Sequence, residues 1–285
     1  MVNQSQNPLK QYFRQPKIYL RLPSSGNFYP HGALEKTATG EYPVYAMTAK
    51  DELIFKTPDA LLNGQATVDV IKSCIPNILN PWAIPSIDLD AVLVAIRMAT
   101  YGEMLDIDIT IPGIEEERSY ALDLRTVLDA LLACAFDAEI VLNDQMTVYV
   151  RPLNYKEFTQ TAIRTLEEQR IFNVVNDESM EDSKKLEIFA SSFRKLTDLN
   201  VGLVSQSIYK IVIPDAEVTD PEHIKEFIDN AEKEFFSAIM KHVDEQKNKF
   251  SIKPLKIQTT EEDQENGAPA ELEVPITLDQ SNFFA

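Results

Sequence analysis

Residues 84–111 read IPSIDLDAVLVAIRMATYGEMLDIDITI, and this stretch decides the fold class. Apolar residues recur at helical spacing from Asp88 to about Ala99, which predicts an amphipathic helix that ends at Gly102. Met104–Ile111 then alternates apolar and polar residues, as a half-exposed strand does. A helix leading into such a strand predicts an α+β fold.

Working outward, the sequence changes character three times. Mixed short strands and helices occupy the first half, and long helical patterns follow. The last stretch carries seven acidic residues and no basic one between Thr259 and Asp279, together with two prolines, which predicts an extended or disordered segment. We therefore expect four parts: a flexible arm at 1–16, an α+β domain at 17–152, a helical domain at 153–258 and an acidic tail at 259–285.

Several helix starts carry capping signals. Thr48, with Asp51 three residues later, predicts the start of a short helix. Thr67 and Asp88 are expected to cap two further helices, and Asn154 a long one at about 155–175. In the second half, helices are also expected at about 183–201 and 221–246, and residues 204–213 fit either a strand or a helix.

The composition restricts the classes of partner. Asp and Glu number 45 against 27 Lys and Arg, so the net charge is −18. A surface this negative repels phosphate backbones and anionic bilayers, which argues against nucleic-acid and membrane binding. The charge either serves solubility alone or favours a basic protein partner.

Cysteine usage and hydropathy indicate a protein made and folded in a reducing cytoplasm. Cys74 and Cys134 lie far apart and suggest free thiols rather than a disulfide framework, although one long-range bridge stays open. No signal peptide is expected at the start, and the longest apolar run, Ala91–Ala99, contains Arg97 and is too short to span a bilayer.

No sequence motif points to catalysis, a cofactor, a metal or a small-molecule substrate. His31, His223 and His242 are isolated from one another, and glycine-rich phosphate loops and nucleophile elbows are missing. Asp106 and Asp108 fall on one face of the expected strand, as a solvated face requires. We expect no enzyme activity; a site assembled only by the fold is the alternative.

Two regions are candidates for binding other proteins. One is the turn and aromatic loop after Pro23, with candidate residues Ser24, Gly26, Phe28 and Tyr29. The other is the tail, whose alternating residues Leu272, Val274 and Ile276 can add a strand to another subunit's sheet, and whose Phe283 and Phe284 can anchor in a neighbour's pocket. A frayed end that touches nothing is the alternative for the tail.

A lysine-rich stretch precedes the tail. Its five members are Lys241, Lys247, Lys249, Lys253 and Lys256. Binding phosphate is one use of such a cluster. We favour complementation of a helix C-terminus, and the acidic tail can also fold against the stretch.

An ordered series of short stretches resembles the T-even-type baseplate hub subunits of contractile-tail bacteriophages. The stretches are Leu22-Pro23-Ser24-Ser25-Gly26-Asn27-Phe28-Tyr29-Pro30, Met47-Thr48-Ala49-Lys50-Asp51-Glu52, Leu61-Leu62-Asn63-Gly64, Ile71-Lys72-Ser73-Cys74-Ile75 and Leu93-Val94-Ala95-Ile96-Arg97-Met98-Ala99-Thr100-Tyr101-Gly102. They match the family's Pro-Ser-x-Gly-x-x-Tyr opening, its threonine-capped acidic helix and its "ALRIASYG"-like helix. The resemblance covers about 17–150. Some relatives have a cysteine knuckle where this chain has 111–114 without cysteine, so metal binding is not implied.

The resemblance implies a non-enzymatic structural protein of a tail baseplate, in the hub or an adjoining wedge, that contacts other tail proteins. It implies residence in the virion and in the host cytoplasm during assembly. A transient assembly chaperone that is absent from the mature virion is the alternative.

Overall fold

The structure, a computed structural model, describes residues 7–55, 64–111, 117–174, 182–265 and 267–276. About half of the chain is helical, and the strands form small antiparallel sheets, so the α+β prediction is confirmed. The sequence also predicts a short helix at 59–62, started by Pro58, and a turn at Pro112 and Gly113. Both predictions lie outside the described residues.

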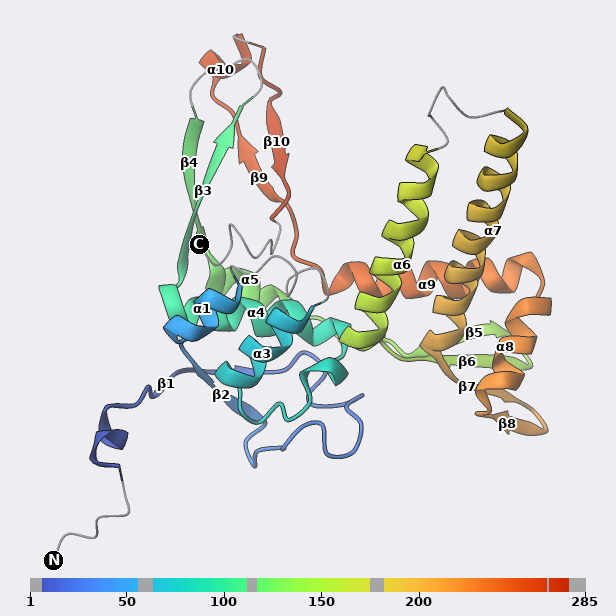
Figure 1. The fold of residues 1–285 in the computed structure, drawn as a ribbon, viewed down its shortest axis with the longest axis horizontal. Helices are drawn as coiled ribbons and strands as arrows, with labels where there is room; N and C mark the ends of the chain where they lie inside the picture. The colour runs from blue at the N-terminus through green and yellow to red at the C-terminus, as the bar shows by residue number, and fades with distance from the viewer. Residues whose placement is uncertain (1–6, 56–63, 112–116, 175–181, 266, 277–285) are drawn as a thin grey trace, which may run out of the picture.

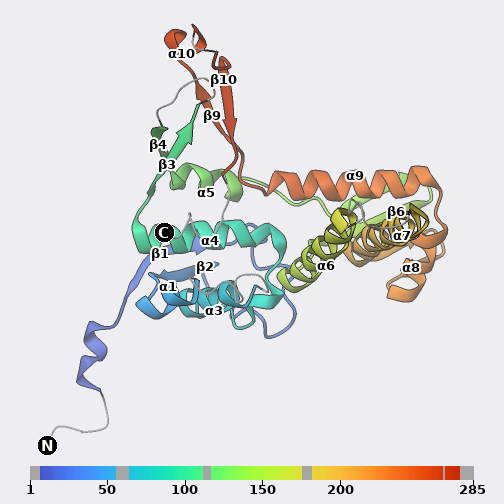
Figure 2. The same cartoon turned by 45° about the horizontal axis from the view of Figure 1, so that its top comes forward.

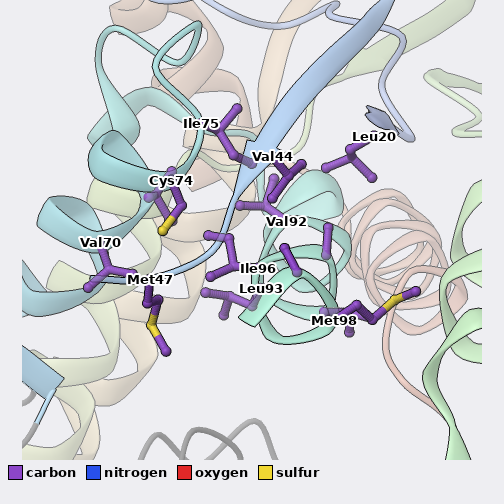
Figure 3. Close-up of a cluster of buried hydrophobic side chains, with 14 of the residues drawn as sticks. Leu20, Val44, Met47, Val70, Cys74, Ile75, Val92, Leu93, Ile96 and Met98 are labelled. Atoms are coloured by element: carbon purple, nitrogen blue, oxygen red, sulfur yellow. The ribbon is translucent and has the colours of Figure 1, made fainter. Parts of the chain in front are cut away.

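The N-terminal part is a core of helices packed on a two-stranded sheet (Figure 1). Its elements are η1 (Pro8–Tyr12), β1 (Pro16–Arg21), β2 (Glu41–Tyr45), α1 (Ala49–Phe55), α3 (Gln65–Cys74), η2 (Pro81–Ala83), α4 (Ser86–Tyr101), β3 (Met104–Thr110), β4 (Glu117–Asp123) and α5 (Leu124–Leu132). Helix α4 is central because it contacts α3, α5, β1 and β2. Figure 3 shows Val92 and Ile96 of α4 meeting Val44 of β2 and Cys74 of α3.

Local capping chemistry explains where some of these helices begin. The Thr48 backbone N–H donates to the Asp51 carboxylate over 2.8 Å, and the Asp51 N–H donates back to Thr48 Oγ over 3.3 Å, so the predicted capping box is confirmed. The prediction for Thr67 is wrong. Helix α3 begins at Gln65 after Gly64, whose φ of 77° suits glycine, and Thr67 is buried within the first turn.

The predicted flexible arm also needs a correction. The Arg14 guanidinium donates to Ser73 Oγ over 2.8 Å and lies 3.6 Å from the Asp51 carboxylate. This charged side chain therefore ties the stretch just before β1 to α1 and α3, so the end of the range 1–16 is held to the core.

The second part combines a four-stranded sheet with long helices (Figure 1). Its elements are β5 (Glu139–Asn143), β6 (Met146–Val150), α6 (Tyr155–Val174), α7 (Asp182–Ser207), β7 (Ile208–Ile213), β8 (Ala216–Val218), α8 (Pro221–Asn230) and α9 (Lys233–Lys249). The strand order is β5-β6-β7-β8, all antiparallel. The expected domain boundary at 152/153 thus runs through one sheet, because β6 lies before it and β7 after it.

The structure decides two further expectations for this part of the chain. The ambiguous segment 204–213 is helical up to Ser207 and a strand from Ile208. The helix expected to run from Pro221 to Gln246 is broken at Ala231 and Glu232, which are extended. The break lets α8 and α9 approach the same core, which contains Ile228 of the first helix and Ile239 of the second.

The acidic stretch is more ordered than expected. It forms β10 (Glu271–Val274), antiparallel to β9 (Leu255–Gln258), with the short helix α10 (Glu261–Glu265) between them. The β9–β10 and β3–β4 hairpins project together from the body, with α10 near the tip (Figure 2). The expectation of an extended or disordered segment is therefore wrong for residues 261–265, which are helical, whereas β10 is extended.

Candidate interaction surfaces

The loop after Pro23 is held by a buried carboxylate. Asp88 in the first turn of α4 is fully buried, and its Oδ1 accepts the Ser24 N–H over 2.7 Å. Asp88 Oδ2 accepts hydrogen bonds from the Ser24 hydroxyl over 2.5 Å and from the Tyr29 hydroxyl over 3.0 Å. Burial raises the pKa of Asp88 to about 6, while these hydrogen bonds oppose the rise. Asp88 is therefore the anchor of this loop, not the predicted helix cap, since α4 begins two residues earlier.

Backbone conformation adds to the shape of the loop. Gly26 has a φ of 74°, and a Cβ there would lie 3.1 Å from a Leu34 methyl and 3.2 Å from the Tyr42 hydroxyl. Ser25 and Phe28 also have positive φ values, which cost a non-glycine residue energy and persist only where surroundings enforce them. The surrounding residues therefore hold this loop in one defined conformation.

The Phe28 ring faces the second part of the chain. It meets Phe136 edge-on, with ring centroids 5.3 Å apart, and Phe136 in turn lies 6.3 Å from Phe250. Four residues predicted to bind a partner, Ser24, Gly26, Phe28 and Tyr29, are thereby placed together. The first two are buried, and partner binding by this loop stays a prediction.

The tail residues that were predicted to bind a partner lie in different places. Leu272 pairs with Ile257, and Val274 with Leu255, so the strand predicted to join another subunit pairs with the chain's own β9. Ile276 packs against the N-terminal core. Phe283 and Phe284 lie outside the described residues. Addition of this strand to another subunit's sheet stays a prediction.

Ion pairs hold the tail to its neighbours. Lys256 lies 3.0 Å from both Glu271 and Glu273, and hydrogen bonds to these carboxylates, led by Glu273, raise the pKa of Lys256. The expectation that acidic tail residues can fold against the lysine stretch is confirmed for this lysine. Asp263, whose side chain is buried, receives two hydrogen bonds of 2.6 Å from Arg118 of β4. This pair joins the two projecting hairpins.

We expect Arg118→Ala to separate these hairpins without unfolding the body. The change removes the fork that holds Asp263, and the hydrogen bonds from Arg118 are the main cause that lowers the pKa of Asp263 to about 2. Hydrogen exchange should speed up at the amides of β9 and β10 and stay unchanged in α4. Arg21→Ala, which breaks an exposed pair with Glu41, is the matched control. Equal exchange in both variants would contradict the prediction.

The helix pair α6–α7 exposes large apolar side chains. The sequence pattern of the helix expected at 183–201 includes Leu186, Phe189 and Phe193. In α7 these side chains are only partly covered: Leu186 is 70% exposed, Phe189 46% and Phe193 60%, whereas Ser192 beside them is 2% exposed. Phe158 and Leu166 on α6 are also exposed. The two helices stand side by side and project from the sheet (Figure 1). Sequence periodicity identified the apolar residues of α7, but it gave no sign that three of them face solvent.

The described residues give little support for other kinds of site. No three His, Cys, Asp or Glu side chains among them gather closely enough to hold a metal ion. Asp106 and Asp108 are exposed on β3, as expected for a solvated face. Cys74 and Cys134 are free thiols. None of the helices in the described ranges combines the length and apolar character that a bilayer span requires.

Comparison with known proteins gives one match. The family model for the T4 bacteriophage base plate protein matches residues 15–268, which takes in both halves together with β9 and α10 and ends before β10. Searches of curated proteins and of solved structures give no match. The match extends the resemblance of the N-terminal half to most of the chain. The chain belongs to the T4 bacteriophage base plate protein family.

Proposed function

We propose that this protein is a non-enzymatic structural component of a contractile-tail base plate, in the hub or an adjoining wedge, and that it binds neighbouring tail proteins through the α6–α7 pair. Family membership supports the base plate role. The exposed row on α7 carries the surface assignment. Leu186, Phe189 and Phe193 are spaced three and seven residues apart and therefore share one helix face.

An exposed row of this kind is costly unless it is covered. Large apolar side chains left in water forgo roughly 1.5–3 kcal/mol each of burial free energy. Contiguous apolar patches on soluble proteins mark interaction sites more often than chance. The net charge of −18 opposes self-association of free chains. A neighbouring tail protein with an apolar surface fits this patch.

The test is quantitative mass spectrometry of purified tails, with this chain measured against a tail subunit of known copy number. A reproducible integral ratio is the expected result. Presence in infected-cell lysate together with absence from tails would overturn the proposal and favour a transient assembly chaperone.

The surface assignment predicts that Phe193→Asp lowers the copy number in tails at least tenfold. A carboxylate placed in an apolar contact costs several kcal/mol unless it is paired, and 1.4 kcal/mol already corresponds to about tenfold in an equilibrium. The free protein should keep its stability because this ring is 60% exposed. Leu53→Asp, at a residue 67% exposed on α1, should assemble normally. Equal incorporation of the two variants would contradict the role of α7.

A further inference from the structure

A pocket of about 350 Å³ opens between α5 and the segment that joins α9 to β9. Its apolar wall is made by Leu122, Val127, Leu131, Ile252, Leu255 and Ile276. Helix α4 holds this segment in place, since the Asp90 carboxylate accepts a hydrogen bond from the Ile252 backbone. The pocket is therefore preformed, because the elements that line it are held in place by contacts with the core.

The tail itself runs into this pocket. Strand β10 ends at Val274, and Ile276, two residues later, is already part of the wall. Phe283 follows seven residues after Ile276, a stretch that spans at most about 25 Å when fully extended. The pocket therefore lies within reach of the phenylalanines of the same chain. Such a short tether supplies an effective concentration on the order of millimolar.

The chemistry of the two sides also matches. Residues 277–285 contain Leu278, Phe283 and Phe284, carry one acidic residue, Asp279, and no basic one. Lys249 and Lys253 line the pocket around its apolar wall, whereas Lys256, which also lines it, is paired with Glu271 and Glu273. An apolar segment with a negative charge fits a pocket that is apolar inside and lined by lysines.

We propose that this pocket is an intramolecular docking site for Phe283 and Phe284 of the same chain. In the docked state the two rings occupy the apolar interior of the pocket, and the Asp279 carboxylate lies close to Lys249 and Lys253. The inference concerns the free chain and does not depend on the base plate role.

Cys134 supplies a direct reporter of the state of the pocket. It lines the pocket and is partly exposed, with its Sγ 3.2 Å from the Lys249 carbonyl oxygen. The other thiol, Cys74, is fully buried in the core, and burial raises its pKa to about 12, so it reacts slowly with thiol reagents. The rate of Cys134 modification therefore measures whether the pocket is covered.

The experiment measures the rate at which a maleimide modifies Cys134 in the full chain, with the labelled residue located by mass spectrometry. The double variant Phe283→Ala/Phe284→Ala should react about tenfold faster, which corresponds to about 1.4 kcal/mol of docking free energy. Tyr12→Ala/Tyr19→Ala, which removes two exposed rings from the N-terminal part, is the matched control and should leave the rate unchanged. A synthetic peptide of residues 277–285 should slow the double variant again.

Two results would overturn the proposal. An unchanged Cys134 rate in the double variant would mean that the phenylalanines do not cover the pocket. A rate in the unaltered chain that falls as protein concentration rises would mean that the occupant comes from a second molecule.

Discussion

Asp88→Ala should lower the free energy of unfolding by about 2–4 kcal/mol at pH 5, because three buried or half-buried donors lose their acceptor. The donors are the Ser24 N–H, the Ser24 hydroxyl and the Tyr29 hydroxyl. At pH 5 the carboxyl is largely protonated, since burial raises its pKa to about 6. Its own desolvation then offsets little of the loss.

Urea unfolding followed by circular dichroism measures this change. Asp106→Ala is the control, because Asp106 is exposed on β3 and its removal should change stability by no more than about 0.5 kcal/mol. A loss below about 1 kcal/mol for Asp88→Ala would show that the loop holds its shape without this anchor.

The same carboxyl should make stability depend on pH. The pKa of folded Asp88, about 6, lies above the unfolded value near 3.8, so the folded state binds the proton more tightly. The resulting stabilisation is fully present below about pH 4 and is lost as the pH rises through about 6. The difference between the two pKa values corresponds to about 3 kcal/mol.

The measurement compares the unaltered chain with Asp88→Asn at pH 7, 6 and 5. The asparagine does not titrate, so the unaltered chain should gain stability relative to the variant as the pH falls. Asp90, whose pKa is also raised to about 6 by burial, is present in both proteins, and its contribution largely cancels in the difference. A stability difference that stays constant across this range would contradict the raised pKa of Asp88.

Several elements could be predicted because their signals are local. Thr48 with Asp51, and Asn154 with Glu157, form reciprocal capping bonds between residues three apart. The hairpins β3–β4 and β5–β6 follow from alternation on either side of a turn. In each case the interacting groups are near neighbours in the chain.

Other features depend on partners far away in the sequence. Ser24 and Asp88 are 64 residues apart. Strand β6 pairs with β7 although the two long helices α6 and α7 lie between them in the sequence. The break between α8 and α9 contains neither proline nor glycine, and both helices contribute to one core, with Ile228 from α8 and Ile239 from α9. Local patterns carry no record of such pairings.

By itself, the sequence determined the α+β class, most element positions and a family resemblance in the first half, because helix and strand periods and capping residues act over a few residues. Only the tertiary structure decided that Asp88 holds the loop after Pro23, that one sheet joins the two halves, and that the apolar row of α7 faces solvent. Periodicity shows which residues share a face of a helix. What covers that face is set by the path of the whole chain.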